Sequence, residues 1–256
     1  MTEPQGPVYM VYDAGLQEAE LTEKVQIPSA DAVKVPPRLA ADPKLIGEAA
    51  DVLVDAEYPV LLTEYAARAP IGFGDTVELA EITGAAVYDI NKRLGFPNQH
   101  PLSVSMHADA FEGADLVVAL DVVDWTRGSH KPNWETREVE AITTPDCKWI
   151  DIGFADIEIS KWATDYNKHH NWDLRILSDT ANAIPALSAA CRSRVKSDPK
   201  LAKRIEERKQ LIGEKHAGQW AKWQEQVKDS WDQMPMHEGR MAREVWEAIK
   251  EVDWVL

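Results

Sequence analysis

Short apolar runs recur through the middle of the chain, separated by longer polar or amphipathic stretches. The runs lie at residues 59–63, 86–89, 115–121, 147–152 and 174–177. Strands buried on both faces of a parallel sheet are apolar throughout rather than alternating, and helices connect them. The pattern therefore predicts an α/β fold: a doubly wound, Rossmann-like parallel sheet with helices on both faces, plus a C-terminal helical extension.

Two Asp-Pro pairs mark expected helix starts. Asp is a good N-cap, and Pro suits the first helical position because its missing N–H would have no partner there. The pairs begin expected helices at 42–56 and 198–232. The second is predicted to be a long helix or a helix pair, with Gly213 and Gly218 as possible breaks.

Two other helices depend on single residues for their boundaries. Asp75 and Glu78 form a variant of the capping box, which predicts a helix that starts at Asp75 and is ended by Gly84. A further helix is expected from Asp179 to about residue 195. Pro185 fits it only if the first turn starts later or the helix is kinked.

The two ends of the chain differ from its middle. Residues 7–13 are mostly apolar after a proline, which predicts a buried strand, and the proline-punctuated residues 14–41 predict an extended linker. A helix is expected at about 238–250 and the start of a strand at 253–256. A strand stopping there would leave an apolar face unburied, so we expect a piece of a longer chain.

Charge and composition narrow the classes of partner. The net charge is -15, and a chain this acidic repels phosphate backbones, so nucleic acid is not an expected partner. No apolar run reaches the roughly 18 residues needed to span a bilayer, and no secretory signal is visible, so we expect a cytoplasmic protein. Cys147 and Cys191 are expected to be buried and inert, because no basic neighbour would lower their pKa.

A series of segments along the chain carries a family resemblance. In chain order they are Gly6–Asp13, Leu45–Thr63, Leu79–Val87, Phe96–Leu102, Ala114–Leu120, Trp149–Ile152, Leu177–Leu187 and Arg240–Leu256. The ordered series resembles the thiamine-diphosphate-dependent enzymes of the acetolactate synthase, pyruvate oxidase and benzoylformate decarboxylase type, which share three domains of similar size. The resemblance covers almost the whole chain, although no single segment is diagnostic.

The resemblance implies a division of the chain. Residues 1–41 would end the pyrimidine-binding domain and form a linker, 42–196 the central Rossmann-like domain, 197–236 a helical linker, and 237–256 the start of the pyrophosphate-binding domain. The expected partners are those two neighbouring domains of the same enzyme and further copies in a homo-oligomer. The tryptophans expected to pack the helices on neighbouring domains are Trp220, Trp223, Trp231 and Trp246.

The resemblance also implies where the cofactor lies. In this family a glutamate of the first domain activates thiamine diphosphate, and a Gly-Asp-Gly stretch with a later Asn of the third domain holds the diphosphate and Mg²⁺, a metal that prefers oxygen ligands. This sequence has no Gly-Asp-Gly, and the nearest string, Gly72 to Asp75, opens a helix in the central region. We therefore expect a structural and interface domain of a 2-keto acid carboligase or decarboxylase, a transferase or lyase. Alone it would carry neither catalytic residues nor metal ligands.

In parts of this family the central domain binds FAD or ADP at the carboxyl ends of its strands. The matching positions here are Glu64 after the first strand, Asp121 after the third, and Asp151 and Gly153 at the fourth. An acid there could hold a ribose hydroxyl, but the glycine-rich turns that admit a pyrophosphate are missing, as in Glu64 to Arg68. Acids that cap helices at the sheet edge are the favoured interpretation.

The histidines are interpreted without a metal. His169 and His170 lie in a stretch typical of a solvated loop, and no third ligand stands at a metal-site spacing. His100 and His107 are interpreted as satisfied surface histidines, with a role in shaping a site shared between domains as the alternative.

The polar stretch 124–145 is interpreted as a solvated loop rather than an anion site, because Arg127, Lys131 and Arg137 are mixed with acids. Two further functions stay open for the chain. One is a free-standing Rossmann-like module that binds FAD or ADP. The other is an interaction protein whose tryptophan-rich helices dock a partner.

Overall fold

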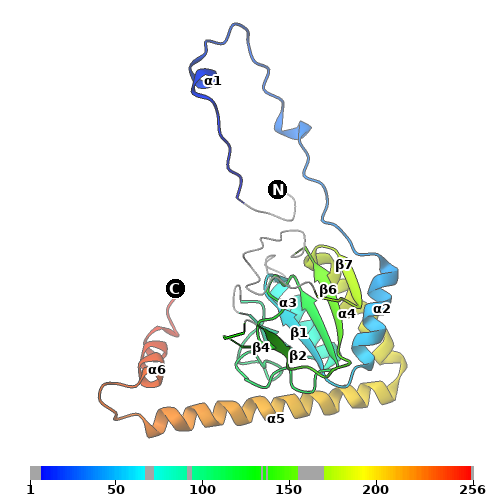
Figure 1. Cartoon of the computed structure of the whole chain (residues 1–256), viewed down its shortest axis with the longest axis vertical. Coiled ribbons are helices and arrows are strands. Elements are labelled where there is room, and N and C mark those ends of the chain that lie inside the picture. Colours follow the sequence, from blue (N-terminus) through cyan, green and yellow to red (C-terminus); the bar gives the residue numbers. More distant parts are fainter. Residues whose placement is uncertain are drawn as a thin grey trace.

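The computed structural model describes residues 7–66, 72–90, 94–133, 135–136, 138–154 and 170–254. Figure 1 shows a sheet domain with a long helix beneath it and an extended segment leading away from it. In chain order the elements are α1 (Ala14–Glu18), the 3₁₀ turn η1 (Ala30–Ala32), α2 (Pro43–Asp55), β1 (Pro59–Thr63), α3 (Gly72–Thr83), β2 (Ala86–Asp89), β3 (Leu116–Leu120), β4 (His130–Pro132), β5 (Val139–Ala141), β6 (Lys148–Gly153), β7 (Leu174–Leu177), α4 (Thr180–Ser197), α5 (Pro199–Asp229) and α6 (Glu238–Ile249).

The central sheet confirms the predicted fold class. Its five strands are all parallel, in the order β2-β1-β3-β6-β7. Every residue of β1 and β3 is buried, as their uninterrupted apolar sequences predict. This is a doubly wound order, in which the direction of winding reverses between β1 and β3. At that point the connections leave opposite sides of the sheet, which is where a crevice is expected.

The helices of the domain cover one face of the sheet. α2 and α3 both pack on α4, so these three lie together on one side. The other face carries Tyr88 and Trp149. There the described residues supply turns and a hairpin, because Phe111 packs on Tyr88 and Trp125 on Trp149, with ring centroids 5.0 and 6.3 Å apart. Helices on both faces are therefore not found among the described residues.

The predicted caps of α2, α4 and α5 are confirmed. The side chains of Asp42, Asp179 and Asp198 each accept a hydrogen bond from a backbone N–H in the first turn of the following helix. α4 begins directly after Asp179, so a later first turn does not explain Pro185, which lies inside the helix. α5 runs through Gly213 without a break.

The prediction that Asp75 caps α3 is wrong. α3 begins at Gly72, and Asp75 lies in its first turn. The hydroxyl of Thr76 donates to the carbonyl of Gly72 over 2.7 Å, a bond that spans one helical turn. Gly84 does end the helix, with a positive φ of 62°.

The polar stretch predicted as a loop contains a small hairpin. β4 and β5 pair antiparallel, with Lys131 opposite Glu140. Each strand has only three residues, too short for a clear alternating pattern. Arg137 lies outside the described residues.

The first half of α5 belongs to the packed domain. Ile205, Arg208, Ile212 and His216 are buried against it. The Arg208 guanidinium donates to the carbonyl oxygens of Ala56 and Thr83, at the ends of α2 and α3. Figure 1 shows α5 continuing past the domain before the chain turns into α6.

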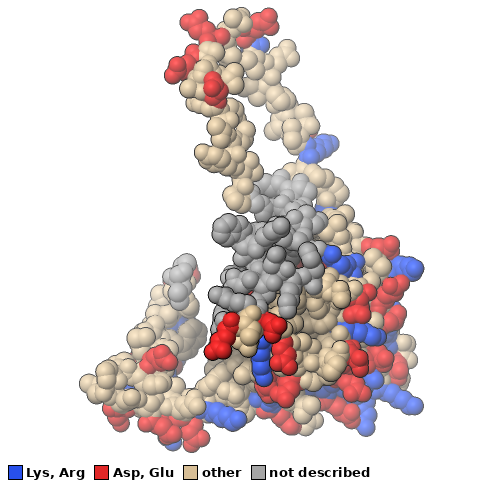
Figure 2. All heavy atoms as spheres, viewed as in Figure 1, with Lys and Arg blue, Asp and Glu red and all other residues tan. Residues whose placement is uncertain are grey.

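The two ends carry exposed apolar residues. Residues 7–13 form no strand and are exposed, so the predicted buried strand is wrong for this chain; a strand needs a neighbour, and the five-stranded sheet pairs with none of these residues. Figure 2 shows acidic side chains gathered at the far end of this segment. At the other end, Asp253 and Trp254 form no strand, and residues 255–256 lie outside the description. No helix of the described chain is long and apolar enough to cross a membrane.

Candidate functional site

The predicted site residues meet at the carboxyl edge of the sheet. Thr63 of β1 lies beside Leu120 of β3, which lies beside Ile152 of β6. Glu64, Asp121 and Gly153 directly follow these three residues, so the structure brings them together. Asp151 lies one residue before Ile152 and points to the opposite face of the sheet from it.

Glu64 holds the loop that follows β3. Its side chain is buried, and its Oε2 accepts the backbone N–H groups of Val123 at 2.7 Å and Asp124 at 3.1 Å. A carboxylate that receives two N–H groups is satisfied by the protein and fixes the loop that donates them. A ligand hydroxyl at Oε2 would have to displace these bonds.

Asp121 links three strand ends. Its backbone has a positive φ of 54°, a conformation that Asp tolerates better than most residues. Its Oδ1 accepts the N–H of Phe154 at 2.8 Å, and the Thr180 hydroxyl donates to its Oδ2 over 3.3 Å. Because the side chain is buried and both oxygens accept protein donors, Asp121 is a structural link at the switch point.

The close approach of Asp121 requires a glycine at position 153. Its φ is +149°, and a Cβ at this position would lie 2.5 Å from Asp121 Oδ1 and 2.8 Å from its Cα. Any side chain would therefore collide with the buried carboxylate and its backbone. The glycine serves the contact between two strand ends, a role that does not need a pyrophosphate.

Asp151 carries the perturbed carboxyl group of the edge. Its pKa is raised to about 6, mainly by burial; Arg175 opposes the shift, and the charge of Asp121 adds to it. The Arg175 Nε lies 3.6 Å from Oδ2, on a side chain that is half exposed. Asp151 is thus a carboxyl group whose charged form is disfavoured by its burial.

A second pair of contacts at this edge was not predicted. The Arg38 guanidinium lies 2.9 Å from Asp179 Oδ2, and the Leu39 carbonyl accepts the Asp179 N–H at 3.1 Å. The segment before α2 is thereby tied to the start of α4. Asp179 was visible as a helix cap, but nothing local in the sequence connects it to a residue 141 positions earlier.

Acids at three neighbouring strand ends share one role. At the end of β2 the side chain of Asp89 accepts the N–H groups of Gly95 and Phe96, as Glu64 and Asp121 do for their loops. The favoured interpretation from sequence was acids that cap helices at the sheet edge; these acids lie at the edge, but the backbone donors they bind belong to loops and not to helix starts. Residues 67–71 of the first turn lie outside the described chain.

The interpretation of His170 as part of a solvated loop is wrong. Its ring lies among those of Trp125, Trp149 and Trp172, with centroids 4.4, 4.4 and 4.7 Å away. These aromatic residues come from separate segments, so the cluster has no local signal in the sequence. His169 lies outside the described residues. No group of three or more metal-binding side chains occurs in the described chain.

His100 and His107 differ in their surroundings. His100 Nδ1 accepts the Leu102 N–H at 3.1 Å, and its Nε2 lies 3.3 Å from Glu81. His107 is buried and stacks on His216 of α5, with ring centroids 6.3 Å apart. His107 is therefore an interface residue between the domain and α5, not a surface histidine. Burial lowers its pKa, and Lys215 and His216 add to that effect.

Cys191 is buried as predicted, whereas Cys147 is only partly buried. Burial raises the pKa of both Cys147 and Cys191 to about 12. Thiols with such a pKa are protonated at neutral pH and are poor nucleophiles.

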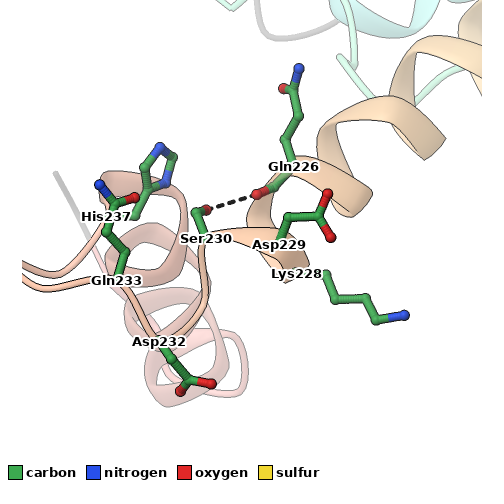
Figure 3. A pocket seen from close by; sticks show the side chains of 7 residues that line it. All are labelled: Gln226, Lys228, Asp229, Ser230, Asp232, Gln233 and His237. Atoms are coloured by element: carbon green, nitrogen blue, oxygen red, sulfur yellow. Dashed lines mark hydrogen bonds between the residues drawn. The ribbon is translucent and has the colours of Figure 1, made fainter.

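A hollow of about 620 Å³ lies where α5 passes into α6. Its lining residues are Gln226, Lys228, Asp229, Ser230, Asp232, Gln233 and His237. Figure 3 shows their side chains pointing in different directions, with one hydrogen bond among them, from the Ser230 hydroxyl to the Gln226 carbonyl. Polar groups that do not converge give a ligand little orientation, so we do not place a site there.

The Gly72 to Asp75 string does not fit a diphosphate and Mg²⁺. All four residues lie in the first turns of α3, and Gly72 is buried. Burial and the neighbouring Glu78 raise the pKa of Asp75, the reverse of what a carboxylate needs to hold Mg²⁺. No cofactor chemistry is assigned to these residues.

No protein-family model matches the sequence, and no curated protein matches it. Among the solved structures that match are three enzymes, two of which are described as thiamin diphosphate-dependent. One from Mycobacterium smegmatis is 21% identical with a TM-score of 0.46 and covers 62% of this chain. Benzoylformate decarboxylase from Polynucleobacter necessarius is 17% identical (TM-score 0.47) and covers 65%, and a 4-hydroxybenzoylformate decarboxylase from Rhodococcus jostii is 18% identical (TM-score 0.45) and covers 62%. The chain spans 29% to 30% of the length of these three.

Proposed function

We propose that this chain is the central structural and interface domain of a thiamine-diphosphate-dependent 2-keto acid carboligase or decarboxylase, and that it is not catalytic alone. Its partners would be the pyrimidine-binding and pyrophosphate-binding domains of the same enzyme, assembled as a homo-oligomer. Thiamine diphosphate and Mg²⁺ would be held by those domains.

The observation that carries the proposal is a complete core between two uncovered apolar ends. The sheet domain buries its strands and the first half of α5, whereas Val8 and Tyr9 are 83% and 91% exposed. On α6, Met241, Val245 and Trp246 are each about half exposed and share one face. Apolar side chains at both ends favour contacts with further protein on each side.

The order of the sequence segments adds to this support. The segments that resemble the family follow one another along the chain in the family's order, from Gly6 to Leu256. The strand order of the sheet agrees with a central Rossmann-like domain. The carboxylates at the sheet edge hold loops and leave the chemistry to other domains.

The coding sequence on either side tests the proposal. We expect the reading frame to continue after Leu256 into a segment with Gly-Asp-Gly and a later Asn. We also expect the chain of 256 residues, titrated calorimetrically with thiamine diphosphate and Mg²⁺, to show no saturable binding, while the longer chain binds both. Saturable binding by the shorter chain, or a frame without that segment, would contradict the proposal.

A free-standing module that binds FAD or ADP is the second candidate. The switch point between β1 and β3 favours it, because ligands of doubly wound sheets bind there. The ribose contact would come from Glu64, Asp121 or Asp151, beside Gly153. A thermal shift with ADP or FAD that disappears in Asp151→Asn would support this candidate, and a shift unchanged in both Asp151→Asn and Glu64→Gln would argue against binding at this edge.

A further inference from the structure

Three tryptophans enclose one histidine on the non-helical face of the sheet. We call Trp125, Trp149 and Trp172 the tryptophan box; they surround the ring of His170 at centroid distances of 4.4 to 4.7 Å. Trp125 belongs to the turn before β4, Trp149 to β6, and Trp172 to the segment that leads into β7. His170 thus joins three segments in one aromatic contact, and neither the sheet edge nor the proposed function uses it.

The box suits an uncharged imidazole. The Nε2 of His170 is buried, and no hydrogen-bond partner for it is found among the described residues. A neutral histidine can leave one ring nitrogen without a proton, whereas the charged form carries a proton on both and needs an acceptor for each. Protonation inside the box would therefore bury an unpaired donor with a charge.

Two ionisable groups act on His170 from nearby. His130 lies next to the box, with its ring 5.1 Å from Trp125 and its Nδ1 2.8 Å from the Ser129 hydroxyl. Asp173 accepts the Trp149 N–H through its Oδ2 at 2.7 Å. The pKa of His170 is lowered to about 4, mainly by burial and also by His130, while Asp173 opposes the shift.

We propose that the tryptophan box is an acid-operated latch: neutral His170 holds the segment before β7 on the sheet, and protonation of the imidazole releases it. In the sheet of the described residues, β7 is an edge strand paired with β6. The residues after it, Asp179 and Thr180, hold Leu39 and Asp121. Releasing the segment before β7 therefore loosens the anchor of the N-terminal segment and one side of the switch point.

The direction with pH follows from the two protonation states. A released histidine has the ordinary pKa of 6.5, and the latched one has about 4. The latch is fully favoured above pH 6.5 and weakens as the pH falls from 6.5 towards 4, because the released form takes up the proton first. At pH 5 the ratio of released to latched form rises about 20-fold over its value at pH 7.

The faces of the tryptophan rings exert an opposite influence. A cation over an indole face is attracted by it, which would favour charged His170 inside the box. The planes of Trp149 and Trp172 lie at 70° and 78° to that of the imidazole, and the plane of Trp125 lies at 37° to it. If that attraction dominated, acid would tighten the latch. The sign of the pH effect therefore shows whether the cost of burying the charge or the attraction to the indole faces is larger.

Hydrogen exchange of single backbone amides tests the latch in the full chain. The probe is the Asp173 N–H, which donates to the Trp149 carbonyl, and the reference is the Val87 N–H, which donates to the Leu102 carbonyl. Between pH 7 and pH 5, after correction for intrinsic rates, we expect the protection of Asp173 to fall about 20-fold relative to Val87. In His170→Phe, which fills the box without a titratable group, the ratio should change less than threefold.

An equal fall in both proteins, or a rise in Asp173 protection in acid, would overturn the latch. Should His170→Phe fail to fold, nuclear magnetic resonance of the wild-type imidazole replaces it. A ring that stays neutral to about pH 4.5 in the latched form agrees with the proposal. A ring that titrates near 6.5 while Asp173 keeps its protection contradicts it.

Discussion

The two halves of α5 belong to different environments although they form one continuous helix. From Pro199 to about His216 the helix buries a side chain at nearly every turn, including Ile205 and Ile212. Beyond His216 it buries none, and Trp220 and Trp223 are only partly covered. The sequence is amphipathic throughout, so amphipathicity alone indicates a face that needs cover and not whether this chain supplies it. The boundary proposed at residue 196 therefore falls before a stretch that the domain needs.

The largest expected effect comes from a cavity in the first half. Ile212→Ala removes a side chain that is 2% exposed, so we expect about 3 kcal/mol of lost unfolding free energy. Val227→Ala, in the half-covered second part of α5, should cost under about 1 kcal/mol. Urea unfolding followed by circular dichroism measures both. Equal losses would show that the two halves are alike.

A substitution at Arg208 should give the next largest loss of stability. Its guanidinium is buried, and burial lowers its pKa to about 10. Arg208→Met keeps much of the volume but leaves the carbonyl oxygens of Ala56 and Thr83 without this donor, which should cost about 2 kcal/mol. Lys222→Met, on the exposed second half, provides the matched control and should change stability by under about 0.5 kcal/mol. If Arg208→Met left the unfolding free energy unchanged, water would have replaced the guanidinium as the donor to these carbonyl oxygens.

Gly84, at the end of α3, tests the contact between the domain and the first half of α5. A Cβ at Gly84 would lie 2.8 Å from the Ile205 carbonyl oxygen of α5, and the residue has φ +62°. Gly113 has φ +82° with no atom within 4 Å of a Cβ. Gly113→Ala should therefore cost about 1 kcal/mol for the backbone alone, and Gly84→Ala about 2 kcal/mol, because α5 must also shift. Equal losses of stability in the two variants would show that the contact with α5 does not contribute.

Local rules recovered most of the fold. The buried strands and the three Asp caps were predicted because each depends on residues a few positions apart. The β4–β5 hairpin was missed because three-residue strands leave no alternating pattern. The strand at 7–13 was predicted from its apolar residues, but a strand forms only where a neighbouring strand pairs with it.

The neighbouring positions of the candidate residues were predicted but their contacts were not, and their use as a nucleotide crevice stays a prediction. The doubly wound order brings Glu64, Asp121 and Gly153 to one edge, as the sequence implied. Two details depend on contacts between distant segments: Gly153 leaves room for Asp121, and tryptophans surround His170. No pattern within one segment carries that information.

The smallest expected effect on stability is on α6, which follows the exposed second half of α5. Trp246 is 48% exposed and α6 buries no residue. In the isolated chain we expect Trp246→Gln to change the unfolding free energy by under about 0.5 kcal/mol, because little of the indole leaves water on folding. The same urea titration used for Ile212→Ala gives the value. A loss above about 1 kcal/mol would mean that α6 packs on this chain's own surface in solution. Its apolar face would then no longer support a neighbouring domain as the partner.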